Sequence, residues 1–137
     1  MNRIQLQELA AVRARESELL LSAAAYDGAY YLVGYAVECG LKACIAKATR
    51  EHDFPDRKTV DDSYSHDLVQ LVAVAGLSTE LKEEQRRSAE FELNWTTTKD
   101  WSEKTRYERK SKQQAELLHK AVTDPEHGVF TWLQKHW

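Results

Sequence analysis

The chain has 137 residues, of which 30% are charged and 42% hydrophobic, and its formal net charge is −3. This length allows one domain whose core needs no metal or disulfide to hold it together. The acidic balance excludes the strongly basic body of a dedicated nucleic-acid binder, although a local basic patch is compatible with it. The N-terminus lacks the apolar stretch of a secretory signal, and no apolar run suits a membrane span of roughly 20 residues. We therefore expect a cytoplasmic protein with no membrane contact.

The two cysteines, Cys39 and Cys44, lie five residues apart on one predicted helix. This spacing directs them to different sides of the helix, so a disulfide between them would require unwinding. The chain has no CxxC, no Cys/His cluster with zinc spacing and no Gly-rich phosphate loop. We expect two free, buried thiols and neither a metal nor a cofactor.

The first 48 residues predict two helices. Residues 3–25 are rich in Leu, Ala, Glu, Gln and Arg, which are strong helix formers. Asp27 is then placed to cap a second helix that runs to about residue 48. This helix contains YYLVGYAVECGLKACIA at residues 30–46 and is apolar on most faces. It is therefore expected at the centre of the fold.

The middle of the chain predicts a loop and two further helices. Residues 51–65 are polar and irregular and contain Pro55, which predicts a loop. A short helix follows, with Ser65 as its start signal and Gly76 as its stop signal. Residues 79–95 then set Leu81, Ala89, Leu93 and Trp95 against a charged face, which is the pattern of an amphipathic helix.

The C-terminal part predicts an irregular segment and two more helices. Residues 96–112 read TTTKDWSEKTRYERKSK, and a helix follows at about 110–123. Asp124 and Pro125 form the usual cap and first residue of a last helix that ends at Trp137. Together the segments predict an all-α fold, an up-and-down bundle of four to five helices in one domain, residues 1–137.

Four stretches occur in an order that matches a known family. AAYDGAYYLVGYAVECGLKACIAK has the pattern of a core helical hairpin, and SHDLVQL, NWTTTKDWSEKTRY and GVFTWLQKHW follow it. On these stretches, which span about residues 20–137, the chain resembles the HEPN domains, small helical bundles of bacterial toxin and defence systems.

The resemblance implies a compact four- or five-helix bundle that is commonly a homodimer. Many members are metal-independent RNases, often encoded beside a small nucleotidyltransferase that neutralises them; others are thought to bind nucleotides, RNA or protein partners. The RNase branch carries an Arg, four to six residues and then a His near the start of a late helix. Here Arg106 is followed five residues later by Ser111, and the next histidine is His119. The RNase motif is therefore absent.

Glu38 and Lys42 are the charges set into the apolar second helix. Their i, i+4 order favours an ion pair, which would contribute only a few tenths of a kcal/mol on an exposed edge. If Glu38 instead faces inward, it needs a partner from another helix, such as an arginine or a histidine, because an unpaired buried charge is costly. His66 and Asp67 begin the helix after the loop, where they either cap it or, for His66, point into a cleft.

The segment 99–112 is the other candidate site. It holds six Lys or Arg against three acids, and Trp101, Arg106 and Tyr107 interleave aromatics with cations. This composition suits a nucleotide or single-stranded nucleic acid; the alternative is that the tryptophans close the bundle end while the charges are solvated. The candidate basic patch consists of Lys104, Arg109, Lys110 and Lys112. The remaining histidines, His52, His119, His127 and His136, have no companion at ligand spacing and are expected in solvent.

These patterns and the resemblance predict a nucleotide-, RNA- or partner-binding component of a bacterial toxin–antitoxin or defence system, assembled as a homodimer. Two alternatives stay open. One is an RNase with a non-standard site built from Arg106, His66 and Glu38. The other is a structural module that docks a nucleotidyltransferase.

Overall fold

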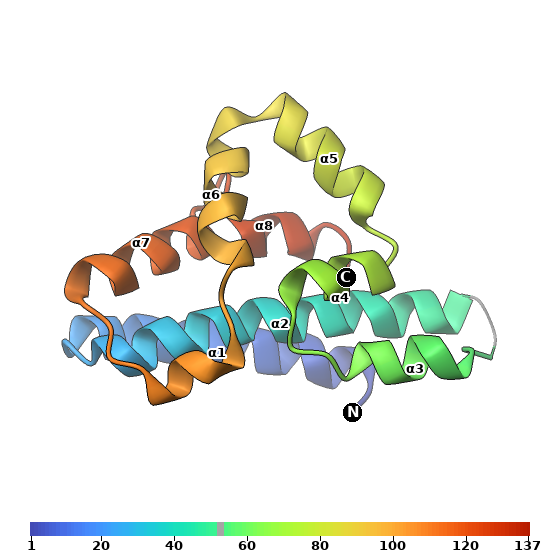
Figure 1. Ribbon diagram of the computed structural model, residues 1–137, viewed down its shortest axis with the longest axis horizontal. Coiled ribbons are helices and arrows are strands. Elements are labelled where there is room, and N and C mark those ends of the chain that lie inside the picture. The colour runs from blue at the N-terminus through green and yellow to red at the C-terminus, as the bar shows by residue number, and fades with distance from the viewer. Residues whose placement is uncertain (52–53) are drawn as a thin grey trace.

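Helices α1 and α2 form a long antiparallel hairpin along one side of the molecule (Figure 1). The structure is a computed structural model and describes residues 1–51 and 54–137. Helix α1 spans Arg3–Ser22 and α2 spans Tyr26–Glu51. A capping box starts α1: Asn2 accepts a hydrogen bond from the backbone N–H of Gln5, whose side chain accepts from the Asn2 N–H.

Asp27 does not have the predicted capping role. Helix α2 begins one residue earlier, so Asp27 lies within its first turn. Its carboxylate instead accepts a hydrogen bond from the backbone N–H of Lys110, at 2.6 Å. Asp27 therefore links the start of α2 to the segment around Lys110. The two residues are 83 positions apart in the sequence, so the local pattern around Asp27 could not predict this contact.

Helix α2 is the centre of the fold, as its apolar composition predicted. It contacts α1, α4, α7, α8 and the 3₁₀ helix η1. Val33, Val37 and Leu41 on this helix are completely buried. The helix is enclosed because apolar residues occupy several of its faces, and each face is covered by a different element.

The middle of the chain forms four short helices: α3 (Arg57–Ser63), α4 (Leu68–Val74), α5 (Ser78–Arg87) and α6 (Ala89–Lys99). The loop predicted for 51–65 is wrong over α3, and residues 52 and 53 of that stretch lie outside the described residues. The missed start signal is Asp56, whose side chain accepts a hydrogen bond from the Thr59 N–H at 2.7 Å. Helix α4 is capped by Asp67 rather than by Ser65, and Gly76, with φ of 72°, follows it.

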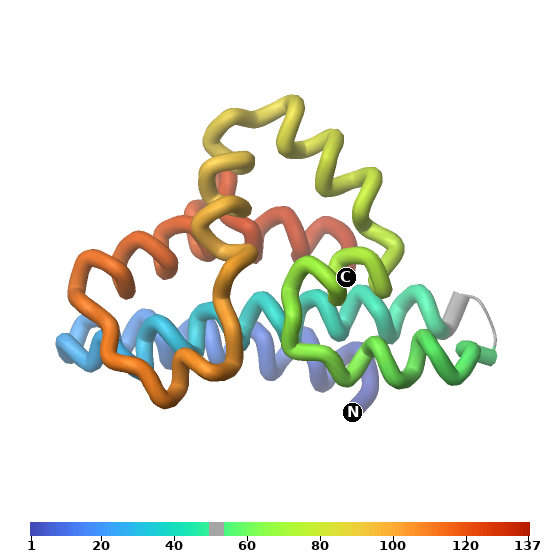
Figure 2. The backbone as a smooth tube through the Cα atoms, in the orientation of Figure 1, coloured from blue at the N-terminus to red at the C-terminus, as the bar shows by residue number. Residues whose placement is uncertain are grey.

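The helix predicted for 79–95 is two helices, because the chain breaks at Ser88. This residue is extended, and its hydroxyl accepts a hydrogen bond from the Phe91 N–H, so it caps α6. Figure 2 shows the chain rising along α5, turning, and descending along α6 toward the hairpin.

The C-terminal part contains η1 (Glu103–Tyr107), α7 (Lys112–Thr123) and α8 (Val129–Gln134). A last helix is present, but the prediction that Asp124 caps it and Pro125 begins it is wrong, because α8 begins at Val129. The Asp124 carboxylate accepts hydrogen bonds from the N–H groups of Glu126 and His127, which closes a turn before α8 begins.

The all-α prediction is confirmed for a helical bundle. Within residues 1–51 and 54–137 there are eight α-helices and no strand, so the helices are more numerous and shorter than the four or five expected. The hairpin of α1 and α2 has the up-and-down connection. Helix α4 packs against α2, α5 carries the chain away from the hairpin, and α6 brings it back before α7 packs along α2 (Figure 1).

Candidate functional site

Glu38 is buried in α2 and is held by a histidine from another element. Its side chain is 2% exposed. Oε1 accepts hydrogen bonds from Lys42 Nζ and from His66 Nδ1, each at 2.9 Å. Oε2 is buried and has no hydrogen-bond partner among the described residues. Glu38 therefore faces inward and does not lie on an exposed edge of α2, and its partner from another segment is His66.

His66 connects Glu38 to η1. Its Nε2 lies 3.1 Å from Glu103 Oε2, while its Nδ1 contacts Glu38. Both ring nitrogens thus face carboxylate oxygens, and only the imidazolium form can donate from both. Asp67, the next residue, caps α4 by accepting from the N–H groups of Val69 and Gln70. The two residues have separate roles. Asp67 caps the start of α4, and this positions the neighbouring His66 side chain between Glu38 and Glu103.

Trp101 lies against α2 one turn from Glu38. Its side chain is buried, and its indole occupies the space where Gly34 has no side chain. It stacks on Tyr31 with ring centroids 5.9 Å apart, and Tyr31 stacks on Tyr35 at 6.1 Å. The indole Nε1 is buried without a hydrogen-bond partner among the described residues. Two buried polar atoms, the acceptor Glu38 Oε2 and the donor Trp101 Nε1, are therefore without partners among the described residues, and the indole packs on α2 at Gly34, one helical turn before Glu38.

A cavity of about 480 Å³ opens beside this cluster. The start of α4, the end of α6 and the segment leading into η1 line it. It brings together three of the residues that the sequence singled out, His66, Asp67 and Trp101, with residues that it did not. The lining consists of His66, Asp67, Val69, Lys99, Asp100, Trp101, Ser102 and Glu103. The carboxylates outnumber the single lysine, so the cavity favours hydrogen-bond donors over anions.

Arg106 and Tyr107 lie on η1 outside this cavity. The Arg106 guanidinium lies 4.8 Å from the centroid of the Tyr107 ring, and Tyr107 is 79% exposed. Tyr107 and Glu103 raise the pKa of Arg106, and so does Tyr31. The pair forms an exposed surface next to Glu103, and the guanidinium, which lies against the Tyr107 ring, is accessible to a phosphate or a base.

The residues of the predicted basic patch differ in their pairing. Arg109 contacts Asp27 at 3.1 Å, Lys110 contacts Glu108 at 2.9 Å, and Lys112 contacts Glu116 at 3.8 Å. Lys110 Nζ also lies 4.5 Å from the centroid of the Tyr30 ring. Lys104 is exposed and has no acidic partner among the described residues. Much of the positive charge read from the sequence is therefore locally neutralised.

The buried thiols and the remaining histidines stand apart from this site. Cys39 and Cys44 are free and buried, and burial raises the pKa of each thiol to about 11. The expectation that His119 and His136 are solvated is wrong, since both are partly buried, and burial lowers the pKa of both. His127, also partly buried, contacts the Ser88 hydroxyl at 3.2 Å. His52 lies outside the described residues.

Sequence reasoning missed Glu103, Lys99, Asp100 and the role of Gly34. A signal existed for Gly34, because it precedes Glu38 by one helical turn and leaves a gap on that face. No local signal existed for Glu103, whose position depends on how η1 folds back on α2.

Comparisons of the chain with protein-family models, with curated proteins and with solved structures gave no match. No helix in the described part of the chain is long and apolar enough to cross a membrane. In residues 1–51 and 54–137, no three His, Cys, Asp or Glu side chains are grouped to hold a metal ion.

Proposed function

We propose that the protein is a HEPN-like, nucleotide- or RNA-binding component of a bacterial toxin–antitoxin or defence system, cytoplasmic and homodimeric. The cavity beside Trp101 is the observation that carries the proposal. Its volume of about 480 Å³ falls in the range of roughly 300–1,000 Å³ typical of small-molecule sites. It also has buried polar atoms close by and exposed cations on the adjoining η1.

The charges support one orientation of the nucleotide. Asp100 and Glu103 line the cavity, and their carboxylates can accept hydrogen bonds, which suits the amino and imino groups of a base and disfavours a phosphate. Lys104 and Arg106 are exposed just outside it. The base therefore enters the cavity, and the phosphate lies over η1, where Arg106 gives a forked contact.

Titration of the protein with AMP and with adenosine, followed by calorimetry at low salt, tests this orientation. Arg106→Ala should weaken AMP binding by at least about tenfold and leave adenosine nearly unchanged, because only the phosphate contact is lost. Asp100→Asn should weaken both ligands. Arg87→Ala, an exposed arginine on α5 paired with Glu84, is the matched control and should change neither. The proposal fails if AMP, GMP, CMP and UMP all show no saturable binding.

A second candidate, an RNase with a non-standard site, is favoured by the contact between Glu38 and His66. A carboxylate that orients a histidine is a common arrangement for proton transfer. Against it, both His66 ring nitrogens are engaged by carboxylates, and His66 would have to release Glu103 to act. Labelled RNA incubated with the wild type, Arg106→Ala and His66→Ala decides this point. No cleavage, or equal cleavage by all three, excludes the RNase.

The third alternative is docking of a nucleotidyltransferase. A stable complex with a nucleotidyltransferase encoded in the same locus, together with absent nucleotide binding, would replace the leading proposal. Light scattering over a range of concentrations tests the homodimer separately.

A further inference from the structure

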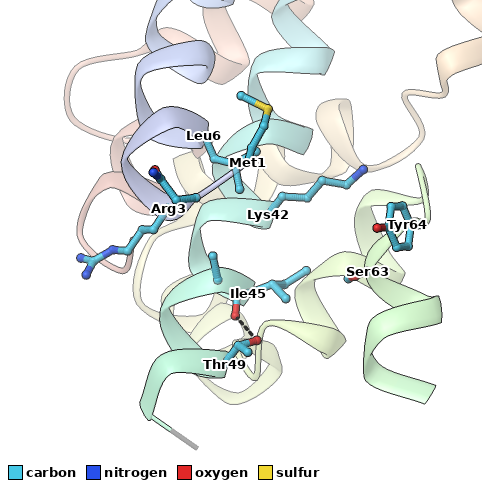
Figure 3. A pocket seen from close by; sticks show the side chains of 10 residues that line it. Met1, Arg3, Leu6, Lys42, Ile45, Thr49, Ser63 and Tyr64 are labelled. Carbon is cyan, nitrogen blue, oxygen red and sulfur yellow. Dashed lines mark hydrogen bonds between the residues drawn. The ribbon is translucent and has the colours of Figure 1, made fainter. Parts of the chain in front are cut away.

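A second cavity, of about 430 Å³, lies between the start of the chain, the second half of α2 and the end of α3 (Figure 3). We propose that it binds a small amphipathic monoanion, a carboxylate with an apolar body, whose head group is held by Lys42. Leu6, Ile45 and Ala46 supply apolar wall, which suits the body of such a ligand. The site is distinct from the cavity beside Trp101, and its test needs no nucleotide.

The charge of the lining selects an anion. In a chain with a net charge of −3, the charged residues found to line this cavity are Arg3 and Lys42, and no acid from the described residues is among them. Arg3 is partly engaged, because its Nη2 donates to the backbone oxygen of Trp137 at 2.8 Å. Figure 3 shows the Arg3 guanidinium on the opposite side of the cavity from the Lys42 ammonium.

Lys42 has hydrogen-bonding capacity left for a ligand. An ammonium group has three N–H donors, and the contact to Glu38 Oε1 at 2.9 Å uses one. The hydroxyl protons of Thr49 and Ser63 are already used, since they donate to the backbone oxygens of Ile45 and Val60. Lys42 is only partly exposed, so a charge-assisted bond to a carboxylate there is less screened than on the open surface.

The same lysine links the two cavities. Glu38 Oε1 accepts a hydrogen bond from Lys42, which lines this cavity, and another from His66, which lines the cavity beside Trp101. An anion that binds the Lys42 ammonium weakens the hydrogen bond between Lys42 and Glu38. The hydrogen bond from His66 then becomes the main contact of the Glu38 carboxylate. Ligand binding at Lys42 should therefore shift the imidazole signals of His66 in an NMR spectrum, although the ligand does not touch His66.

Octanoate is the probe, titrated by calorimetry, with 1-octanol and octylamine as neutral and cationic analogues. We expect saturable octanoate binding that is at least about tenfold tighter than that of either analogue. Lys42→Met should weaken octanoate by a similar factor. Lys47→Met removes a cation from the same helix that does not line the cavity, and it should leave the affinity unchanged.

Ala46→Leu fills the cavity while the contact between Lys42 and Glu38 is kept. It should abolish octanoate binding, and it keeps the proposal testable if Lys42→Met fails to fold. The proposal is overturned if octanoate does not saturate, if octylamine binds equally well, or if Ala46→Leu binds like the wild type. A dimer that buries this face and is unaffected by octanoate would overturn it as well.

Discussion

Replacing Gly34 with alanine tests whether the gap on α2 is what holds Trp101 in place. In an exposed helix interior this substitution stabilises a protein by about 1 kcal/mol, because glycine is the poorer helix former. Here an ideal Cβ would lie far closer than 3.0 Å to three atoms of the Trp101 indole, a separation that real Cβ atoms essentially never show. The indole is buried and stacks on Tyr31, so it can move away only by giving up its contacts with α2 and with that ring.

The expected cost follows from these two opposing effects. Forcing extra volume into a packed site costs about 1–3 kcal/mol, and a tryptophan driven out of its site costs about 3–5 kcal/mol. The Cβ separations are too short for a small shift to relieve, so the second figure applies. After the helix-propensity gain of about 1 kcal/mol is subtracted, Gly34→Ala should lower the free energy of unfolding by about 2–4 kcal/mol. Because Trp101 lines the first cavity, AMP binding should weaken in the same variant.

Gly40→Ala, on the same helix, is the matched control. Its Cβ would lie 3.2 Å from Leu133 Cδ1, the end of a flexible side chain that can shift slightly. Its change in unfolding free energy should therefore stay within about 1 kcal/mol of zero. Urea unfolding followed by circular dichroism measures both variants. A Gly34→Ala protein as stable as Gly40→Ala would refute the packing argument.

Three further outcomes are expected. His66→Ala removes a partner from buried Glu38 and should lower the free energy of unfolding, measured with urea at pH 7, by about 1–3 kcal/mol. The native Cys44 thiol, whose pKa is about 11, should react with iodoacetamide at pH 8 at least about a hundredfold more slowly than in urea. Burial lowers the pKa of His119 in the folded state, so the unfolded chain binds the proton more readily. Stability should therefore be complete above about pH 6.5 and fall below it, and His119→Gln should reduce that fall.

Each of these expectations has a contrary result. Glu103→Gln changes the partner on the other nitrogen of His66, and Glu103 is much more exposed than Glu38. If Glu103→Gln lowered the free energy of unfolding as much as His66→Ala does, the loss in His66→Ala could not be assigned to the burial of Glu38. Equal alkylation rates of native and unfolded protein would show that the thiol is accessible. An identical loss of stability from pH 7 to pH 5 in wild type and His119→Gln would assign the fall to other groups.

The helical class and the central place of α2 could be predicted from sequence, because propensity and apolar composition act over a few turns of one helix. The errors arose where short polar segments carried competing signals. Asp56 and Ser88 are ordinary capping residues, yet only the packed structure decides that each one starts a helix. Asp124 has the residue type of a cap and instead closes a turn.

The candidate site divides in the same way. Sequence alone led to the prediction that an inward-facing Glu38 needs a histidine or an arginine from another helix, because a buried charge without a partner is too costly. That the partner is His66, and that Glu103 lies on its other nitrogen, was decided only by the tertiary structure. These contacts join α2, His66 and η1, which are distant in sequence. The segments meet only when α4 and η1 pack against α2, and no local sequence pattern specifies that packing.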